Sequence, residues 1–218
     1  MTGGLVAGRR PVQRVVKWLA DRLLAAVLLV LLAPVGLAFA LWVLLDAGRP
    51  VLFVQRRVGR GGAEFAMLKF RTMVNDAVKV GLELGISEDP HGVIRDDPRI
   101  TRSGRFLRRT GLDELPQLVN VLAGQMSLVG PRPDIPEQAQ HYSEHERRRL
   151  AVRPGITGHA QVTGRDEIEW PERIELDIWY ITHWSLLLDA KILLATVAQV
   201  FRDEPEPLLD THNIRRSA

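Results

Sequence analysis

Two adjacent carboxylates in the middle of the chain, Asp113 and Glu114, are the residues whose types and setting best suit chemistry on a phosphate. A run of cations precedes them: Arg102, Arg105, Arg108 and Arg109. Apolar residues at helical spacing follow from Leu115, with Gly124 as a stop signal, and Thr110 forms a capping-box pattern with Asp113. The pattern predicts a helix N-terminus at the acidic pair, where main-chain N–H groups and the helix dipole keep Asp113 ionised and attract an anionic group.

The same residues have a more ordinary interpretation. A carboxylate in the first turn of a helix is commonly a cap, and arginines beside acidic residues commonly form a solvated salt-bridge surface. The choice between the two interpretations depends on the rest of the chain.

Further cations occur in segments whose main chain is expected to be held rigidly. Residues 51–57 and 64–73 are apolar runs around a glycine-rich turn, which predicts a β-hairpin. Lys69 and Arg71 alternate with an aromatic residue in the second run, so both cations are expected on one face of the strand. Arg132 stands between two prolines, which fix the main chain on either side and reduce the entropy lost when the guanidinium binds an anion.

The composition is that of a folded domain with an appendage. The chain has 218 residues, of which 46% are hydrophobic and 25% charged, so it is not a disordered polymer. It contains no cysteine, which excludes disulfides, thiol catalysis and zinc sites with Cys ligands. Residues 74–97 predict a loop with a short helix near 75–80, residues 135–150 a charged helix, and residues 186–200 a second apolar helix in the core or on a membrane surface.

The longest apolar run, residues 23–45, carries no charge. A membrane helix needs about 20 apolar residues, so this run predicts membrane insertion. Pro34 lies within it, where it removes a main-chain donor and kinks the helix. Basic residues flank the run on both sides: Arg9, Arg10, Arg14, Lys17 and Arg22 before it, and Arg49, Arg56, Arg57 and Arg60 after it. Lysine and arginine gather on the cytoplasmic side of membranes, so we expect both ends of the run to face the cytoplasm.

A helix that enters the membrane, breaks at Pro34 and returns to the same face meets this condition. The alternative is a single span with a proline kink.

Seven motifs occur in order along the chain. They are Lys69-Phe-Arg-Thr-Met73, Asp97-Pro-Arg-Ile-Thr101, Gly104-Arg-Phe-Leu-Arg108, Leu112-Asp-Glu-Leu-Pro-Gln117, Asn120-Val-Leu122, Met126-Ser-Leu-Val-Gly-Pro-Arg-Pro133 and Arg153-Pro-Gly-Ile-Thr-Gly158. Together they resemble the monotopic phosphoglycosyl transferases, the bacterial sugar-transferase family that starts glycan assembly on undecaprenyl phosphate. The resemblance covers nearly everything from Lys17 to Val200, and the length is similar to that of the small members.

The resemblance implies an enzyme that moves a sugar 1-phosphate from a UDP-sugar to polyprenyl (undecaprenyl) phosphate, releases UMP and needs Mg²⁺. It implies that Asp113 is the nucleophile of a phosphosugar–Asp intermediate, that Glu114 with Asp113 holds the metal, and that the membrane helix breaks at Pro34. The chemistry suits the residues, because phosphoryl transfer needs positioning and charge neutralisation more than acid–base groups. The candidates for diphosphate and lipid-phosphate contacts are Lys69, Arg71, Arg108 and Arg132.

The expected fold is α+β and mainly helical, with a re-entrant membrane helix, a small β-hairpin and amphipathic interfacial helices around a catalytic core. The expected divisions are 1–48 for the tail and membrane helix, 49–203 for a catalytic domain at the membrane surface, and 204–218 for a polar tail. The resemblance places the protein in the bacterial inner membrane with the catalytic domain facing the cytoplasm. Membrane lipid is then a partner, and a homodimer is a further possibility.

The sequence departs from the family pattern at four places. Ala33 precedes the proline where serine is frequent, Gln125 stands for an aspartate, Gly111 for a serine or threonine, and His159 for a tryptophan or leucine. None of these touches the acidic pair. The roles of His159 and of the glycine-rich loop 154–164 are left open.

Two other classes of function compete with a transferase. A non-catalytic membrane scaffold of the same fold would gain nothing from the acidic pair and the cation set. A membrane-tethered nucleic-acid binder would use the arginine run, but the net charge is only +3 and no nucleic-acid-binding motif is present. We therefore expect no nucleic acid among the partners.

Overall fold

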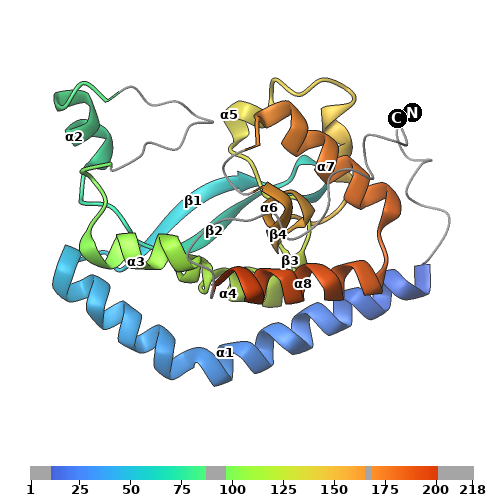
Figure 1. Cartoon of the computed structure of the whole chain (residues 1–218), viewed down its shortest axis with the longest axis horizontal. Coiled ribbons are helices and arrows are strands. Elements are labelled where there is room, and N and C mark those ends of the chain that lie inside the picture. The colour runs from blue at the N-terminus through green and yellow to red at the C-terminus, as the bar shows by residue number, and fades with distance from the viewer. Residues whose placement is uncertain (1–10, 87–96, 165–167, 201–218) are drawn as a thin grey trace.

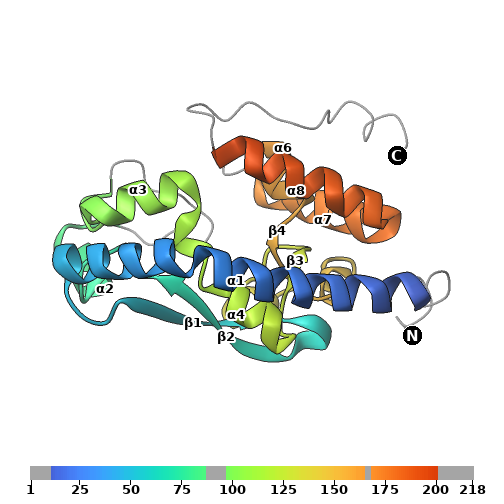
Figure 2. The same ribbon diagram turned by 90° about the horizontal axis from the view of Figure 1, so that it is seen from below.

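The computed structural model describes residues 11–86, 97–164 and 168–200. Its longest element is α1 (Pro11–Ala47), which holds the whole apolar run and contains Pro34. The helix is continuous but bent in its middle (Figure 1), and from below it is nearly straight, so the bend lies in the plane of Figure 1 (Figure 2). A proline inside a helix removes one hydrogen bond and crowds the preceding turn, which accounts for a bend. The expected break is therefore a bend within one helix.

The predicted hairpin is confirmed. Strands β1 (Leu52–Val58) and β2 (Glu64–Phe70) pair antiparallel, with Leu52 opposite Phe70 and Val58 opposite Glu64. The 3₁₀ turn η1 (Arg60–Gly62) joins them, and its two glycines have φ of 70° and 85°, a region that side-chain-bearing residues rarely adopt. Two shorter strands, β3 (Ser127–Val129) and β4 (Gly155–Thr157), pair in parallel.

Short helices surround the strands. In chain order they are α2 (Ala77–Glu83), α3 (Arg102–Thr110), η2 (Leu112–Glu114), α4 (Gln117–Ala123), α5 (Pro136–Ala139), η3 (Glu146–Ala151), α6 (His159–Gly164), α7 (Trp170–His183) and α8 (Leu186–Val200). The short helix after the hairpin and the second apolar helix are where the sequence predicts them. Seen from below, α8 lies on one side of α1, and α4 and the hairpin lie on the other (Figure 2).

The charged helix expected over 135–150 is wrong, because two short segments, α5 and η3, take its place. The Ser143 N–H donates to Glu146 Oε2 at 2.7 Å, and the Glu146 N–H donates back to Ser143 Oγ at 3.3 Å. Reciprocal bonds of this kind start a new helical turn, so the chain restarts here instead of continuing α5.

The described residues form three hydrophobic clusters, and α1 belongs to two of them. Ala25 lies in the larger cluster with Val121 of α4 and Ile192 of α8, all fully buried. Val43, on the other half of α1, is buried with Leu107 of α3. The helix therefore packs on the body along both of its halves.

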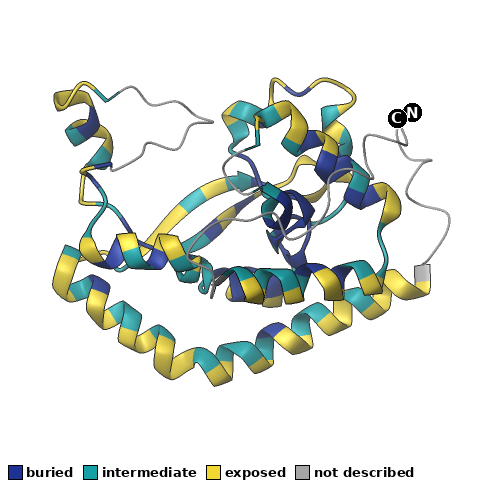
Figure 3. Ribbon diagram, in the orientation of Figure 1, coloured by how far each residue is buried: buried dark blue, intermediate teal, exposed yellow. Residues whose placement is uncertain are grey.

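The outer side of α1 is apolar and uncovered. Leu23, Val30, Leu37 and Leu45 are each about 70% exposed or more (69–78%), and Figure 3 shows exposed positions along the side of α1 that faces away from the body. Within the described ranges, α1 is the one helix long and apolar enough to cross a membrane. An uncovered apolar surface of this length calls for an apolar environment or partner.

Both ends of α1 are tied to the same body. Near its start, Lys17 Nζ lies 2.8 Å from Asp189 Oδ2 of α8. At its end, Asp46 Oδ2 accepts hydrogen bonds from the N–H and the hydroxyl of Ser103, both at 2.7 Å. The residues on either side of the apolar run are thus attached to one folded unit.

Candidate active site

The acidic pair lies in the 3₁₀ turn η2, between α3 and α4, and not in the first turn of an α-helix. Gly111 ends α3 with φ 71°, and α4 begins only at Gln117. The Thr110 hydroxyl donates backwards to Phe106 O at 2.9 Å, so the expected capping box with Asp113 is wrong. A left-handed glycine satisfies the end of α3 without a side-chain cap, which leaves the threonine free to bond its own helix.

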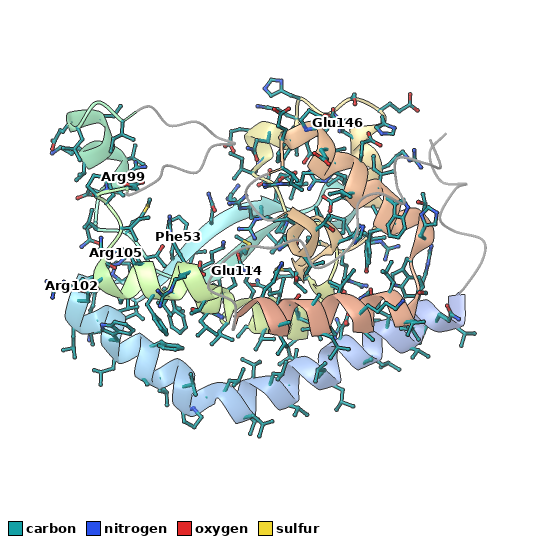
Figure 4. All side chains as sticks on the ribbon, in the orientation of Figure 1. Phe53, Arg99, Arg102, Arg105, Glu114 and Glu146 are labelled. Atoms are coloured by element: carbon teal, nitrogen blue, oxygen red, sulfur yellow. The ribbon has the colours of Figure 1, made fainter. Side chains whose placement is uncertain are left out.

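Glu114 is the meeting point of two cations from distant segments. Lys69 Nζ of β2 and Arg132 Nη1 both donate to Glu114 Oε1, at 3.0 and 2.9 Å. Burial alone would raise the pKa of Glu114, but Arg132 and Lys69 outweigh it and lower the pKa to about 2. Figure 4 places Glu114 where α3 gives way to α4. The carboxylate is therefore ionised throughout the physiological range.

Asp113, one residue earlier, has different surroundings. It is 9% exposed, and within the described ranges no donor forms a hydrogen bond to its carboxylate. Burial raises the pKa of Asp113, the charge of Lys69 opposes this, and the neighbouring Glu114 adds to it. The expectation that a helix N-terminus stabilises this carboxylate is wrong, because its surroundings disfavour the charge. A carboxylate held in this way is more basic than an ordinary aspartate.

Arg108 is the member of the α3 arginine run that acts on the pair. Its Nε donates to Thr72 Oγ1 at 2.8 Å, and its charge lowers the pKa of Asp113 as one of the smaller influences. Arg102 and Arg105 lie toward the other end of α3 (Figure 4). The structure thus brings together Lys69, Arg108 and Arg132 around the acidic pair.

The structure does not bring Arg71 to this cluster. The strand β2 ends at Phe70, and the guanidinium of Arg71 turns to main-chain carbonyls at the end of α1. It donates to Arg49 O at 2.9 Å, to Gly48 O at 2.6 Å and to Ala47 O. The last carbonyls of a helix have no partner within it, and a buried arginine satisfies several of them. The geometry therefore assigns Arg71 to the junction of α1 and the body.

Asn120, which the sequence analysis quoted in a motif without a role, supports Lys69. Its Oδ1 accepts from the Leu68 N–H at 3.1 Å and its Nδ2 donates to Ala66 O at 2.7 Å. One amide of α4 thereby fixes β2 beside the lysine. The signal is an amide residue six positions after Glu114, on a short helix, which a sequence alone does not distinguish from a surface position.

Comparison with known proteins identifies the family. The family model for bacterial sugar transferases matches residues 12–203. The chain belongs to this family. It is a sugar transferase of the phosphoglycosyl transferase type, as its motifs predict.

Several relatives are similar over most of the chain. The sugar transferase EpsL of Bacillus subtilis is 43% identical over 183 residues, which cover 84% of this chain and 86% of the relative. The exopolysaccharide production protein ExoY of Sinorhizobium fredii is 36% identical, with 88% of each chain covered. A UDP-glucose:undecaprenyl-phosphate glucose-1-phosphate transferase of Xanthomonas campestris is 45% identical over 85% of this chain, which spans 39% of that protein.

The sugar transferase offers two carboxylates to a metal ion. Within the described ranges no group of three or more His, Cys, Asp or Glu side chains lies close enough to hold one. Mg²⁺ is commonly bound by one or two carboxylates together with substrate phosphates and water, so Asp113 and Glu114 fit a shared site of that kind. They do not fit a site built from protein ligands alone.

His159 packs in the interior beside α7. Its ring stacks on Trp179 with centroids 4.7 Å apart, and the residue is 5% exposed. Burial lowers the pKa of His159 to about 4, so the ring is neutral at physiological pH. The structure thus places this departure from the family pattern in the packing of α6 on α7.

Proposed function

We propose that this sugar transferase moves a sugar 1-phosphate from a UDP-sugar to undecaprenyl phosphate and releases UMP, as a membrane step in exopolysaccharide or related glycan synthesis. The main support for this proposal is the difference in hydrogen bonding between Glu114 and Asp113. Glu114 binds two cations, whereas Asp113 beside it receives no hydrogen bond from the described residues. A carboxylate without donors keeps its lone pairs available for attack on phosphorus. The names of the Xanthomonas and Sinorhizobium relatives support the same class of reaction.

The reaction takes two displacements at one phosphorus atom. An Asp113 oxygen attacks the phosphorus that carries the sugar, and the bond from that phosphorus to the bridging diphosphate oxygen breaks as UMP leaves with the electron pair. A phosphate oxygen of undecaprenyl phosphate then attacks the same phosphorus, and Asp113 leaves as a carboxylate. Charge balances in both steps without net uptake or release of a proton.

The surrounding cations serve charge neutralisation. Lys69 and Arg132 converge on Glu114, and Arg108 approaches from the end of α3, so a phosphate at the acidic pair would meet fixed positive groups from several segments. Fixed charges cost no reorganisation during the reaction and favour a transition state in which negative charge spreads over phosphate oxygens. Asp113 and Glu114 would hold Mg²⁺, which supplies further neutralisation of the diphosphate when bound.

The attachment of both ends of α1 to one body supports a helix that enters the membrane and returns. A straight helix rises about 1.5 Å per residue, so the 29 residues from Lys17 to Asp46 would span roughly 43 Å. A spanning helix of that length places its two ends on opposite sides of a bilayer, where one folded body cannot contact both. We therefore propose a monotopic protein of the bacterial inner membrane with its site on the cytoplasmic face, where UDP-sugars are made.

A UMP-release screen across UDP-sugars tests the function directly. The purified full chain in detergent, with Mg²⁺ and undecaprenyl phosphate, is expected to release UMP with at least one donor and to form a lipid-linked diphosphosugar. Release of UDP in place of UMP would mean transfer of the sugar alone and would overturn the proposal. Absence of any nucleotide product with folded protein would favour the non-catalytic scaffold.

A further inference from the structure

The segment that carries Arg132 is held at every carbonyl. Over residues 131–134, which we call the strap, Pro131 O accepts from the Gly155 N–H at 2.9 Å and Arg132 O accepts from Arg149 Nη2 at 3.1 Å. Pro133 O accepts from Arg57 Nη1 at 3.1 Å, and Asp134 O accepts from the Val58 N–H at 2.9 Å. Four consecutive carbonyls bound to four donors fix a main chain that forms no regular structure of its own.

Among these four donors, Arg149 is buried and contacts several further side chains. Its side chain is 2% exposed, and besides Arg132 O it contacts Asp134 and Tyr142 through Nη1, the latter at 2.8 Å. Its Nη2 also lies 2.6 Å from Asp177 Oδ2 of α7, a carboxylate whose side chain is likewise 2% exposed. The Tyr142 hydroxyl donates to Asp134, so these two side chains are joined to each other as well as to the guanidinium.

A buried charge network of this kind is a poor way to gain stability alone. Desolvating an arginine and two carboxylates costs about as much as their attraction returns, and well-packed apolar residues of similar volume do as well or better. The network therefore has a better explanation in the geometry it imposes. The network contacts the strap, and the strap carries Arg132, whose guanidinium lies 2.9 Å from Glu114.

We propose that Arg149 is a positioning residue for the phosphate site: it holds the Arg132 main chain so that the Arg132 guanidinium reaches Glu114, and Asp177 holds Arg149. This inference rests on the proposed function for its catalytic consequence. Arg149 itself contacts neither the acidic pair nor, through any contact in the described ranges, Lys69. Arg149 acts on the site through the strap, by its bonds to the main chain of Arg132 and to the side chain of Asp134.

Hydrogen exchange tests the hold on the strap without reference to the reaction. The amides of Val58 and Gly155 donate into the strap, so their exchange reports its opening. In the full chain, Arg149→Lys keeps the charge but loses the planar fork, and we expect exchange at least about tenfold faster at these two amides than in the wild type. The milder Tyr142→Phe, which removes one hydroxyl, is expected to give a smaller acceleration at the same amides.

A matched control separates this effect from general destabilisation. Asp97 and Arg99 form another buried pair, 2.8 Å apart with 4% and 6% of their side chains exposed. Figure 4 shows Arg99 at the α2 end of the molecule, far from Glu146, which begins the helical turn that carries Arg149. Asp97→Asn is expected to lower Tm by a similar amount but to leave exchange at Val58 and Gly155 unchanged. Equal acceleration in Asp97→Asn, or wild-type exchange in both Arg149→Lys and Tyr142→Phe, would overturn the proposal.

The catalytic consequence is tested by a double-mutant cycle in the UMP-release assay. Tyr142→Phe is expected to lower kcat/KM for the donor about three- to tenfold in the wild type and by less than twofold in an Arg132→Lys background. A purely structural role would cost the same factor in both backgrounds and would overturn the positioning role. If the wild type releases no UMP, the proposed function fails, while the exchange measurements still decide whether Arg149 holds the strap.

Discussion

Lys69 Nζ and Glu114 Oε1 lie 3.0 Å apart although 45 residues separate them along the chain. The hairpin brings the lysine, the turn η2 brings the carboxylate, and the strap brings Arg132 to the same oxygen. With two cations on one glutamate, the neighbouring Asp113 is left as the carboxylate whose charge the site does not compensate with a hydrogen bond. The two adjacent acids are thus distinguished by their partners.

Asp113→Asn is expected to abolish turnover, with a loss of at least about 10³-fold, because an amide oxygen is a poor nucleophile at phosphorus. Rapid-quench mass spectrometry of the wild type with donor alone should show a phosphosugar adduct on Asp113, and the kinetics should be ping-pong. Glu64→Gln, at an exposed surface pair with Arg56, is the control and should retain full activity. Ternary-complex kinetics with no adduct at any quench time would contradict the covalent mechanism.

The same two carboxylates should have opposite effects on stability. The folded-state pKa of Asp113 is raised, so its charge opposes folding above that pKa, and Asp113→Asn should raise Tm at pH 7. The folded-state pKa of Glu114 is lowered to about 2 from 4.5, so its contribution is present above pH 4.5 and is lost as pH falls toward 2. Glu114→Gln should therefore lower the unfolding free energy at pH 7 by roughly 3 kcal/mol. Thermal melts from pH 3 to 8 measure both effects, and equal shifts of the same sign would refute this assignment.

Glu114→Gln is also expected to weaken the dependence on Mg²⁺. Hard cations prefer charged oxygen ligands, so the Mg²⁺ concentration for half-maximal rate should rise about tenfold while the maximal rate falls. A Mg²⁺ titration of UMP release measures this. An unchanged titration midpoint would remove Glu114 from the metal site.

Arg71→Ala is expected to destabilise the fold by about 2–4 kcal/mol, because carbonyls at the end of α1 lose a charged donor. The KM for the donor in the folded fraction should stay within about twofold of the wild type, whereas Lys69→Ala should raise it at least tenfold. Denaturant unfolding and donor titrations together check the assignment. A large rise in KM without loss of stability would return Arg71 to the phosphate site.

The topology can be tested because the native chain has no cysteine. Val12→Cys and Arg60→Cys place one thiol at each side of the apolar run, and both positions are exposed. In intact cells, a membrane-impermeant thiol reagent should label neither variant until the membrane is opened. Labelling of the Val12→Cys variant alone from outside would mean a spanning helix, and Pro34→Ala should shift some molecules toward that state by straightening α1.

Structure that depends on neighbouring residues can be predicted from this sequence, whereas contacts between distant segments cannot. The hairpin is predictable because its turn glycines and alternating residues are adjacent, and the acidic pair is conspicuous by type. Arg71 was assigned to phosphate because no sequence pattern shows that unpaired carbonyls 22–24 residues earlier lie against it. The predicted Thr110 cap is wrong for a local reason: Thr110 is the last residue of α3, which the left-handed Gly111 ends. The sequence gives Arg149 no role, because its partner Asp177 is 28 residues away.

The helix α1 contributes to two of the hydrophobic clusters, and this affects how the enzyme can be purified. Ala25 and Val43 are fully buried against the body, and the expected division after residue 48 cuts through both contacts. A truncated chain without α1 would bare the undersides of α3, α4 and α8 to water and would precipitate rather than yield a soluble catalyst. The helix α1 is therefore a structural part of the catalytic unit, and we expect activity to depend on a detergent or lipid that covers its apolar outer side.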